Sequence, residues 1–341
     1  MTAHVNGAGT TSDSVATSDA VITHRDPSPQ SRALYWAARA TLRQVYRVWP
    51  LTDVGIRGLA AVERGFTRLP HPAGVRVEPT TLGGVPALTI APIAPGSATG
   101  APEAAGPDAM AEVVVLYLHG GAFVFCGPST HSRLCGSLAT GLGAPVHSVR
   151  YRKLPEVDIA AVVDDVYCAY RALSAQLPAE HRIVVAGDFA GGFLAAKLCE
   201  LAARDGVRPP AALVGYSPLF DLDAELSDGS WFTRDAYQPA STLRRAQRFW
   251  SSRPYELPGS RSMVECDPAV FPPTLITLAA GELVETAALA LTERLHAAGR
   301  TVETHRWHTA VHAFPVLDAL TPESRRAGEI TVGFLRRVLR G

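Results

Sequence analysis

Three short segments of the chain hold residue types suited to chemistry on a carbonyl compound. His-Gly-Gly at residues 119–121 follows an apolar run at 113–118, and Gly-Asp-Phe-Ala-Gly-Gly occupies residues 187–192. His312 lies near the C-terminus. Glycine N–H groups can approach a developing oxyanion because no Cβ blocks the way, and histidine is the most frequent general acid or base. We therefore expect these three segments to form the functional site.

The elements around these segments alternate between strand and helix. The predicted strands are 75–77, 87–90, 113–118, 144–149, 182–186, 211–217, 274–279 and 302–307. The predicted helices are 32–48, 54–68, 129–141, 158–177, 191–205, 287–299 and a terminal helix from residue 322. Continuous apolar strands interleaved with helices are typical of a mostly parallel sheet that is covered on both faces. We therefore predict an α/β fold.

The chain divides by composition and pattern into three parts. Residues 1–30 are polar and rich in Thr, Ser and Ala, and we expect a disordered leader there. Residues 31–74 are expected to form N-terminal cap helices, and residues 75–341 the main domain. An excursion at about 221–270 interrupts the alternation, which predicts a cap over one end of the sheet. The Gly/Pro/Ala-rich stretch 94–110 is expected to be a surface loop.

Composition excludes several classes of protein. The 341 residues contain 32 Lys and Arg against 32 Asp and Glu, so the chain lacks the basic surplus that nucleic-acid binding requires. No apolar stretch is long enough for a membrane span. The five cysteines are scattered without a CxxC pair, which argues against a disulfide framework and a zinc site. We expect a cytoplasmic protein without cofactor or metal.

Five motifs in order resemble one known family. They are His-Gly-Gly-Ala-Phe at 119–123, Tyr-Arg-Lys-Leu-Pro-Glu at 151–156, Gly-Asp-Phe-Ala-Gly-Gly at 187–192, Ser-Pro-Leu-Phe-Asp-Leu at 217–222 and Val-His-Ala-Phe at 311–314. From about residue 75 onwards the chain resembles the hormone-sensitive-lipase-type carboxylesterases and lipases, the HGGG branch of the α/β-hydrolase fold. The resemblance implies a mostly parallel central sheet flanked by helices, with a helical cap.

The resemblance also implies a role for each motif. Gly120 and Gly121, with the N–H of Ala190, would form the oxyanion hole, and His312 would be the general base. The family pattern G-x-S-x-G has its nucleophilic serine where this chain has Phe189. A phenylalanine has no lone pair and cannot form an acyl intermediate. The nucleophile position is therefore degenerate.

The third member of the expected triad is ambiguous in the sequence. The family places an aspartate roughly thirty residues before the histidine, and residues 277–285 contain none. That position falls on Gly281 or on Glu282, depending on the spacing used. Glu282 could orient an imidazole as an aspartate does, whereas Gly281 could not.

Other residues near the motifs have both functional and structural interpretations. His119, Phe123, Cys126 and Asp188 are expected to line the pocket, and Ser129, Thr130 and His131 to form part of its wall. Cys126 could replace the serine if its pKa were lowered, although a buried inert thiol is the simpler interpretation. Asp164 and Asp165 lie on a predicted helix, where a solvated face or a contact with Arg152 would account for them.

We expect an esterase-like and lipase-like protein that lacks the serine and is repurposed for acid/base chemistry on a small carbonyl-containing ligand. His312 and the Gly120/Gly121 segment would act on that ligand, with Glu282 orienting the histidine. One alternative is a non-catalytic pseudo-hydrolase with Phe189 packed against a small apolar ligand. Another is a carboxylic ester hydrolase with a different nucleophile. The oligomeric state is open, a homodimer being one alternative.

Overall fold

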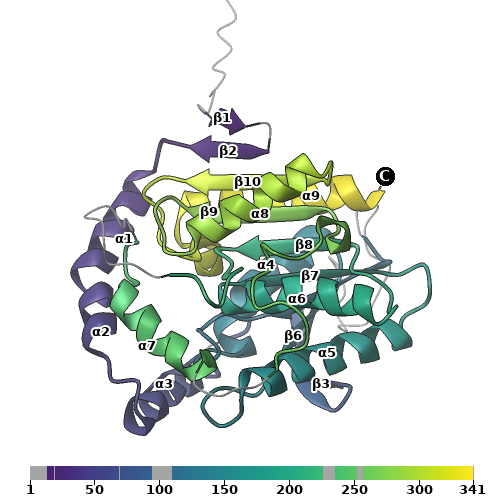
Figure 1. The fold of residues 1–341 in the computed structure, drawn as a ribbon, viewed down its shortest axis with the longest axis horizontal. Coiled ribbons are helices and arrows are strands. Elements are labelled where there is room, and N and C mark those ends of the chain that lie inside the picture. The colour runs from purple at the N-terminus through teal and green to yellow at the C-terminus, as the bar shows by residue number, and fades with distance from the viewer. Residues whose placement is uncertain are drawn as a thin grey trace, which may run out of the picture.

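A ten-stranded sheet forms the centre of the protein (Figure 1). The structure is a computed structural model that describes residues 14–18, 20–68, 70–93, 110–225, 235–251 and 256–340. Its strands are β1 (Ser14–Ser18), β2 (Val21–His24), β3 (Val75–Leu82), β4 (Val85–Pro92), β5 (Val113–Leu118), β6 (Val146–Val149), β7 (Arg182–Asp188), β8 (Ala212–Tyr216), β9 (Thr274–Ala279) and β10 (Val302–Trp307). Their spatial order is β1-β2-β10-β9-β8-β7-β5-β6-β4-β3. The run from β2 to β6 is parallel, and β1, β4 and β3 pair antiparallel.

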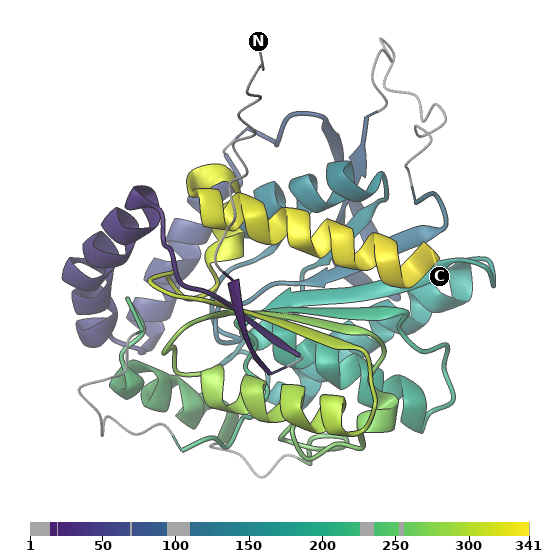
Figure 2. The same ribbon diagram turned by 90° about the horizontal axis from the view of Figure 1, so that it is seen from above.

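Helices cover both faces of this sheet. They are α1 (Pro29–Ala40), α2 (Leu42–Val48), α3 (Asp53–Phe66), α4 (Ser132–Leu142), α5 (Ile159–Gln176), α6 (Ala190–Arg204), α7 (Ala240–Ser251), α8 (Glu285–Ala297) and α9 (Pro322–Arg340), with 3₁₀ turns η1 (Pro128–His131), η2 (Pro268–Val270) and η3 (Phe314–Leu320). Helices α4 and α9 pack on one face, and α5, α6 and α8 on the other; Figure 2 shows α9 and α8 on opposite sides. The predicted mostly parallel α/β sheet is confirmed.

Strand β5 shows why its sequence is continuously apolar. Every residue of β5 is buried, and successive side chains enter different cores. Val114, Leu116 and Leu118 join the core that includes residues of α5 and α6, whereas Val113, Val115 and Tyr117 join the core that includes residues of α4 and α9. Side chains alternate between the faces of a strand, so burial on both faces requires an apolar residue at each position.

Helices α1, α2, α3 and α7 gather beyond one end of the sheet (Figure 1). Side chains of α7 bind the backbone of α2: Thr242 Oγ1 donates to the carbonyl of Tyr46 at 2.8 Å, and Arg245 donates to the carbonyls of Tyr46 and Arg47 at 3.1 Å. The last carbonyls of a helix lack intrahelical partners, so these bonds join α7 to the end of α2. Two segments separated by almost two hundred residues thus form one cap.

The N-terminal segment differs from the expectation. Residues 1–30 were predicted to be disordered, yet β1 and β2 form a hairpin there and α1 begins at Pro29. Strand β2 pairs parallel with β10, and Thr304 N–H donates to the carbonyl of Ala20 at 2.8 Å. A four-residue strand leaves little signal in sequence, because its stability comes from the distant strand that it joins. Residues 1–13 lie outside the described residues.

One further expectation needs adjustment, and two others lie partly outside the described residues. The helix predicted for 32–48 is divided at Thr41, where α1 ends and α2 begins, and the Thr41 hydroxyl donates to the carbonyl of Ala37 at 2.7 Å. The predicted surface loop at 94–110 lies outside the described residues except for Met110. The excursion 221–270 contains α7, although residues 226–234 and 252–255 are likewise not described.

The parallel strands all end at the same edge of the sheet, next to the cap. His119 follows β5, Phe189 follows β7, Glu282 follows β9 and His312 follows β10. Ligands in open α/β sheets bind outside the carboxyl ends of the strands. The topology therefore gathers all the motif residues at one place. Within the described part of the chain, no helix has the length and apolar character needed to cross a membrane.

We predict that Leu116→Ala lowers the free energy of unfolding by about 2–5 kcal/mol, because it leaves a cavity at a fully buried position. Urea denaturation followed by tryptophan fluorescence measures the change. Leu320→Ala is the control, since Leu320 is 64% exposed and its truncation is expected to change stability by less than about 0.5 kcal/mol. Equal losses for the two variants would contradict the assignment of β5 to the core.

Candidate active site

Phe189 occupies a sharp turn between β7 and α6. Its backbone has φ 46° and ψ −111°, a strained conformation for a residue with a side chain. The neighbouring glycines make the turn possible: a Cβ on Gly191 would lie 1.8 Å from the carbonyl oxygen of Leu118, and one on Gly192 would lie 2.5 Å from the Cβ of Pro218. The Phe189 side chain is buried and presents no nucleophilic atom at the apex of the turn.

His312 is paired with Glu282. The imidazole Nδ1 lies 2.8 Å from Glu282 Oε2, and both side chains are buried. Of the two candidates left open by the sequence, Glu282 meets the histidine, whereas the N–H of Gly281 donates to Glu285 Oε2 at 2.8 Å. The second oxygen of Glu282 accepts from the N–H of Ala279 at 3.2 Å, which fixes the carboxylate. The pair has the arrangement of a histidine and the acid that orients it.

The charge of Glu282 sets the protonation of His312. Burial by itself would lower the pKa of His312, because it disfavours the charged imidazolium. The hydrogen bond and charge of Glu282, together with the charges of Asp235 and Asp188, outweigh burial and raise this pKa above its usual range. The imidazole is therefore made more basic, as a general base requires.

The ring of Phe189 lies against this imidazole. The two rings meet edge to face with their centroids 4.9 Å apart. The outer nitrogen of His312, Nε2, is buried and has no hydrogen-bond partner among the described residues. A ligand reaches this nitrogen only after a neighbouring side chain has moved, and Phe189 is in direct contact with the ring.

The oxyanion segment is arranged differently from the prediction. The N–H of Gly120 donates to Asp188 Oδ1 at 2.9 Å, so it does not face a ligand, and the expectation for Gly120 is wrong. Gly121 and Ala122 both have positive φ, at 100° and 54°, and no described group accepts from their N–H groups. Ala190 is the first residue of α6, where a helix leaves its N–H groups without intrahelical acceptors. Gly121, Ala122 and Ala190 are thus the available donors.

Asp188 holds the oxyanion segment in place. Its Oδ1 accepts from the hydroxyl of Tyr117 at 2.8 Å and from Gly120, and lies 3.1 Å from His131 Nε2. Burial would raise the pKa of Asp188, but the charge and hydrogen bond of His131 and the bond from Tyr117 lower it below its usual value. Asp188 was expected to line the pocket. It is instead buried, and its Oδ1 is occupied by these internal bonds. The sequence could not predict this, because the partners of Asp188 come from distant segments.

His119 and Phe123, also expected to line the pocket, are buried as well. His119 stacks on Tyr151 with ring centroids 4.1 Å apart, and burial lowers its pKa to about 3, so it stays neutral. Phe123 is fully buried and meets Phe193 and Trp250 edge to face. Both residues support the loop from within the protein.

Cys126 is the expected alternative nucleophile, and its surroundings oppose that role. Burial and the charge of Asp188 raise the pKa of the Cys126 thiol above its usual range. A thiol becomes nucleophilic as the thiolate, which requires a lowered pKa. The environment of Cys126 therefore favours the inert thiol.

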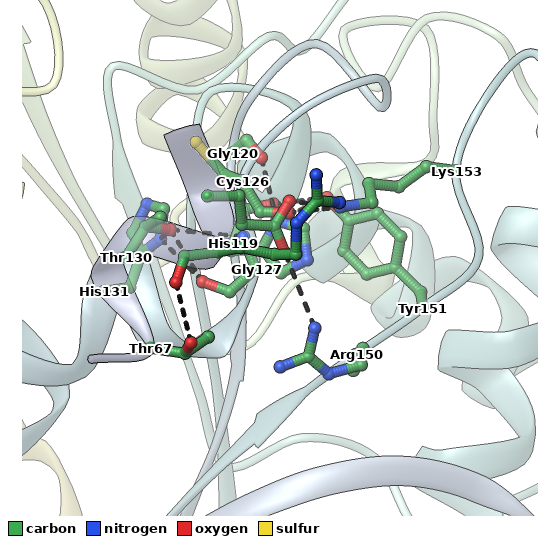
Figure 3. Close-up of polar contacts among 12 residues, drawn as sticks. Thr67, His119, Gly120, Cys126, Gly127, Thr130, His131, Arg150, Tyr151 and Lys153 are labelled. Carbon is green, nitrogen blue, oxygen red and sulfur yellow. Dashed lines mark hydrogen bonds and ion pairs between the residues drawn. The ribbon is translucent and has the colours of Figure 1, made fainter. Parts of the chain in front are cut away.

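No sequence pattern predicted the link between the cap and the oxyanion loop. Glu63 of α3 is buried, and its carboxylate lies 2.5 Å from Lys153 Nζ and 3.5 Å from an Arg150 nitrogen. Lys153 also donates to the carbonyl of Cys126 at 2.8 Å. Figure 3 shows Arg150, Lys153 and Cys126 together around this loop. A single Glu in an amphipathic helix could not be distinguished from an exposed charge without knowing where the helix docks.

Neighbouring residues have structural contacts. Thr130 Oγ1 donates to the carbonyl of Gly127 at 2.7 Å and lies 2.8 Å from His131 Nδ1. The predicted contact of Arg152 with Asp165 is confirmed, with Arg152 nitrogens 2.7–3.1 Å from the carboxylate. In the part of the chain that the structure describes, no three His, Cys, Asp or Glu side chains are grouped to hold a metal ion.

Comparison with known proteins identifies the family of the chain. The model of the alpha/beta hydrolase fold family matches residues 115–316. The chain is 32% identical over 321 residues to the carboxylesterase/phospholipase LipF of Mycobacterium tuberculosis, covering 90% of this chain and 81% of that protein. It is 34% identical over 226 residues to an acetyl-hydrolase of Streptomyces hygroscopicus, covering 65% of this chain and 75% of that protein.

Solved structures give the same result. A hormone-sensitive lipase from a metagenome library superposes with a TM-score of 0.75 at 28% identity, covering 92% of this chain and all of that one. An esterase from the bacterial hormone-sensitive lipase family superposes with a TM-score of 0.76 at 26% identity, covering 92% and 99%. The chain belongs to the α/β-hydrolase-fold family, in its hormone-sensitive-lipase-like esterase branch.

We predict that His131→Gln destabilises the protein by about 1–3 kcal/mol at pH 5.5, and that this deficit falls as pH rises through the raised pKa of His131. Burial alone would lower the pKa of His131, but Asp188 raises it. The ion pair therefore contributes fully below the ordinary histidine pKa of about 6.5 and is lost as pH rises through the raised value. Above that pH the neutral histidine and glutamine are both neutral donors.

Urea denaturation at pH 5.5, 7 and 9 measures this difference. His296→Gln on the exposed side of α8 is the matched control, and it should have little effect at any of these pH values. A deficit of His131→Gln that does not change with pH would contradict an ion pair with Asp188.

Proposed function

We propose that this esterase-family protein has lost the serine acyl-transfer step and performs proton transfer on a small carbonyl compound. The ligand's carbonyl oxygen would be bound by the N–H groups of Gly121, Ala122 and Ala190. His312, oriented by Glu282, would be the acid and base. The observation that carries the proposal is the buried Glu282–His312 pair, which is present beside a residue that cannot be a nucleophile.

The desolvation cost of the Glu282–His312 pair supports a functional role for it. A buried carboxylate and imidazole are costly to desolvate, and replacing a buried ion pair with apolar residues is often neutral or stabilising. The pair is therefore not explained by stability alone. The strained turn at Phe189 and the positive φ values at Gly121 and Ala122 support the same conclusion, since strain of this kind is concentrated at functional sites.

The proposed step balances without a covalent intermediate. His312 Nε2 takes a proton from the carbon next to the carbonyl, and the electron pair of the C–H bond moves to form an enolate. The three N–H groups stabilise the charge on the enolate oxygen. The imidazolium then returns the proton to the same carbon or to another atom of the ligand, which is the step shared by isomerase and lyase reactions.

The burial of His312 Nε2 favours one second candidate. With Phe189 against the imidazole, His312 Nε2 is buried, so a ligand cannot reach the general base in this conformation. A protein that binds a small apolar ligand without turnover would also use this arrangement. In that case binding would be indifferent to His312→Ala.

The proposal predicts exchange of deuterium into 2-pentanone next to its carbonyl when the protein is incubated with it in D2O. Proton NMR follows the loss of the signal. His312→Ala should slow the exchange by about 10²–10⁴-fold, the usual contribution of general acid–base catalysis, while His296→Ala should not change it. Exchange by the unmodified protein no faster than in buffer would reject the proposal and leave the binding candidate.

A second variant tests the remaining machinery. Phe189→Ser is expected to hydrolyse p-nitrophenyl acetate, because it places a hydroxyl at the turn beside the Glu282–His312 pair. The double variant with His312→Ala should lose about 10³-fold or more of that rate. Rapid hydrolysis by the unmodified protein would show that another nucleophile acts. Silence of Phe189→Ser would mean that the pair and the N–H donors are not aligned with residue 189.

A further inference from the structure

The turn at residues 235–238 packs directly on His312. Asp235 Oδ1 accepts from the N–H groups of Tyr237 and Gln238 at 3.0 and 2.7 Å, which closes the turn. The hydroxyl of Tyr237 donates to the carbonyl of His312 at 3.2 Å, and the Tyr237 ring meets the imidazole edge to face at 6.0 Å between centroids. The turn is therefore held against both the backbone and the ring of His312.

Two side-chain oxygens of this turn are buried without a partner. Asp235 is 2% exposed, and its second oxygen, Oδ2, has no hydrogen bond among the described residues. Gln238 Oε1 is in the same condition. Most buried polar atoms in proteins have a partner, so an unpaired one requires a structural or functional explanation, such as a bound water, an ion or a ligand group. Both atoms are acceptors, and what they lack is a hydrogen-bond donor.

The surrounding charges do not supply that donor. Arg43 approaches the turn, but its guanidinium donates to the backbone carbonyl of Asp235 at 2.8 Å. Among the described residues, no Lys or Arg forms an ion pair with the Asp235 carboxylate. Burial raises the pKa of Asp235 above its usual value, while the charge of its ionised form contributes to the raised pKa of His312.

We propose that Asp235 is a specificity-determining residue whose Oδ2 accepts a hydrogen bond from a hydroxyl or protonated amine of the ligand. The inference rests on the proposed function, and it narrows the ligand to carbonyl compounds that carry a hydrogen-bond donor. Because Asp235 Oδ1 is already used by the turn, Oδ2 is the oxygen left for a ligand. Gln238 would add a second acceptor.

Two ketones of nearly equal shape test this. 4-Hydroxy-2-butanone and 2-pentanone differ by a hydroxyl in place of a methyl, and their binding is followed by NMR titration of the His312 ring signal. A hydrogen bond to a charged acceptor predicts that the unmodified protein binds the hydroxyketone about tenfold more tightly. Binding of protonated 4-amino-2-butanone shows whether an ammonium or a hydroxyl is the preferred donor. Tighter binding of the hydroxyketone or of the aminoketone than of 2-pentanone supports the inference.

Asp235→Asn is the informative variant. Asparagine keeps an oxygen for the N–H groups of Tyr237 and Gln238 but replaces Oδ2 with an NH2 group, which cannot accept a hydrogen bond. A ligand hydroxyl can still accept from that NH2, whereas the ammonium of 4-amino-2-butanone has no acceptor. The preference for the aminoketone over 2-pentanone should therefore fall to about onefold or less. Asp267→Asn is the matched control, because Asp267 Oδ1 caps another turn by accepting from Ala269 N–H and is exposed. It should retain the tenfold preference.

The outcomes separate the inference from the proposed function. Equal binding of 2-pentanone, the hydroxyketone and the aminoketone by the unmodified protein would overturn the role of Asp235 and leave the proposed function standing, and that comparison needs no variant. Binding of none of the three, together with no deuterium exchange, would overturn both. A preference for the aminoketone over 2-pentanone that survives Asp235→Asn would also overturn the inference.

Discussion

The site depends on the carboxylate of Asp188, which stands at the end of β7 one residue before the strained turn. One of its oxygens accepts hydrogen bonds from the Tyr117 hydroxyl of β5 and from the Gly120 N–H of the oxyanion segment. The same oxygen lies 3.1 Å from Nε2 of His131, the last residue of η1. Because the carboxylate is buried, these bonds form where water cannot compete, and breaking one would leave a buried group unpaired. The carboxylate thus joins the loop that follows β5 to the turn that follows β7. Because the N–H of Gly120 donates to this carboxylate, it is not available to a ligand.

The geometry around that anchor is the geometry of an esterase, with one residue type changed. The turn, the three available N–H groups and the Glu282–His312 pair are all present. Phe189 fills the apex of the turn with an apolar ring against the imidazole. The fold therefore indicates the ancestry of the protein, whereas its function has to be inferred from the side chains at the site. We propose proton transfer as the chemistry that these side chains can perform without a nucleophile at residue 189.

The cap adds chemistry of its own. Helix α3 brings Glu63 to Lys153 and so reaches the oxyanion loop, while the turn before α7 brings Asp235 and Tyr237 to His312. Helix α3 lies between β2 and β3 in the chain, and the turn before α7 lies between β8 and β9, so both contacts come from segments inserted between strands of the sheet. Inserted segments of this kind are where a shared fold can acquire a particular specificity.

The sequence by itself determined the fold and the place of the site. Strands β5, β9 and β10 have the predicted limits. Every residue of β5 and β9 is buried, whereas β10 mixes polar and apolar residues and is only partly buried. Strand β3 was predicted too short, since Pro79 interrupts the pattern, whereas an edge strand tolerates a proline. Glycines marked the two turns, and topology carried them to one edge of the sheet.

Tertiary structure alone decided which groups meet. The choice of Glu282 over Gly281, the use of the Gly120 N–H by Asp188, the pairing of β2 with β10 and the docking of Tyr237 on His312 all join residues distant in sequence. Local pattern records whether a position is apolar, polar or conformationally special, but it does not record the partner. A hydrogen bond is set by distance and direction in space, and these exist only once the chain has folded.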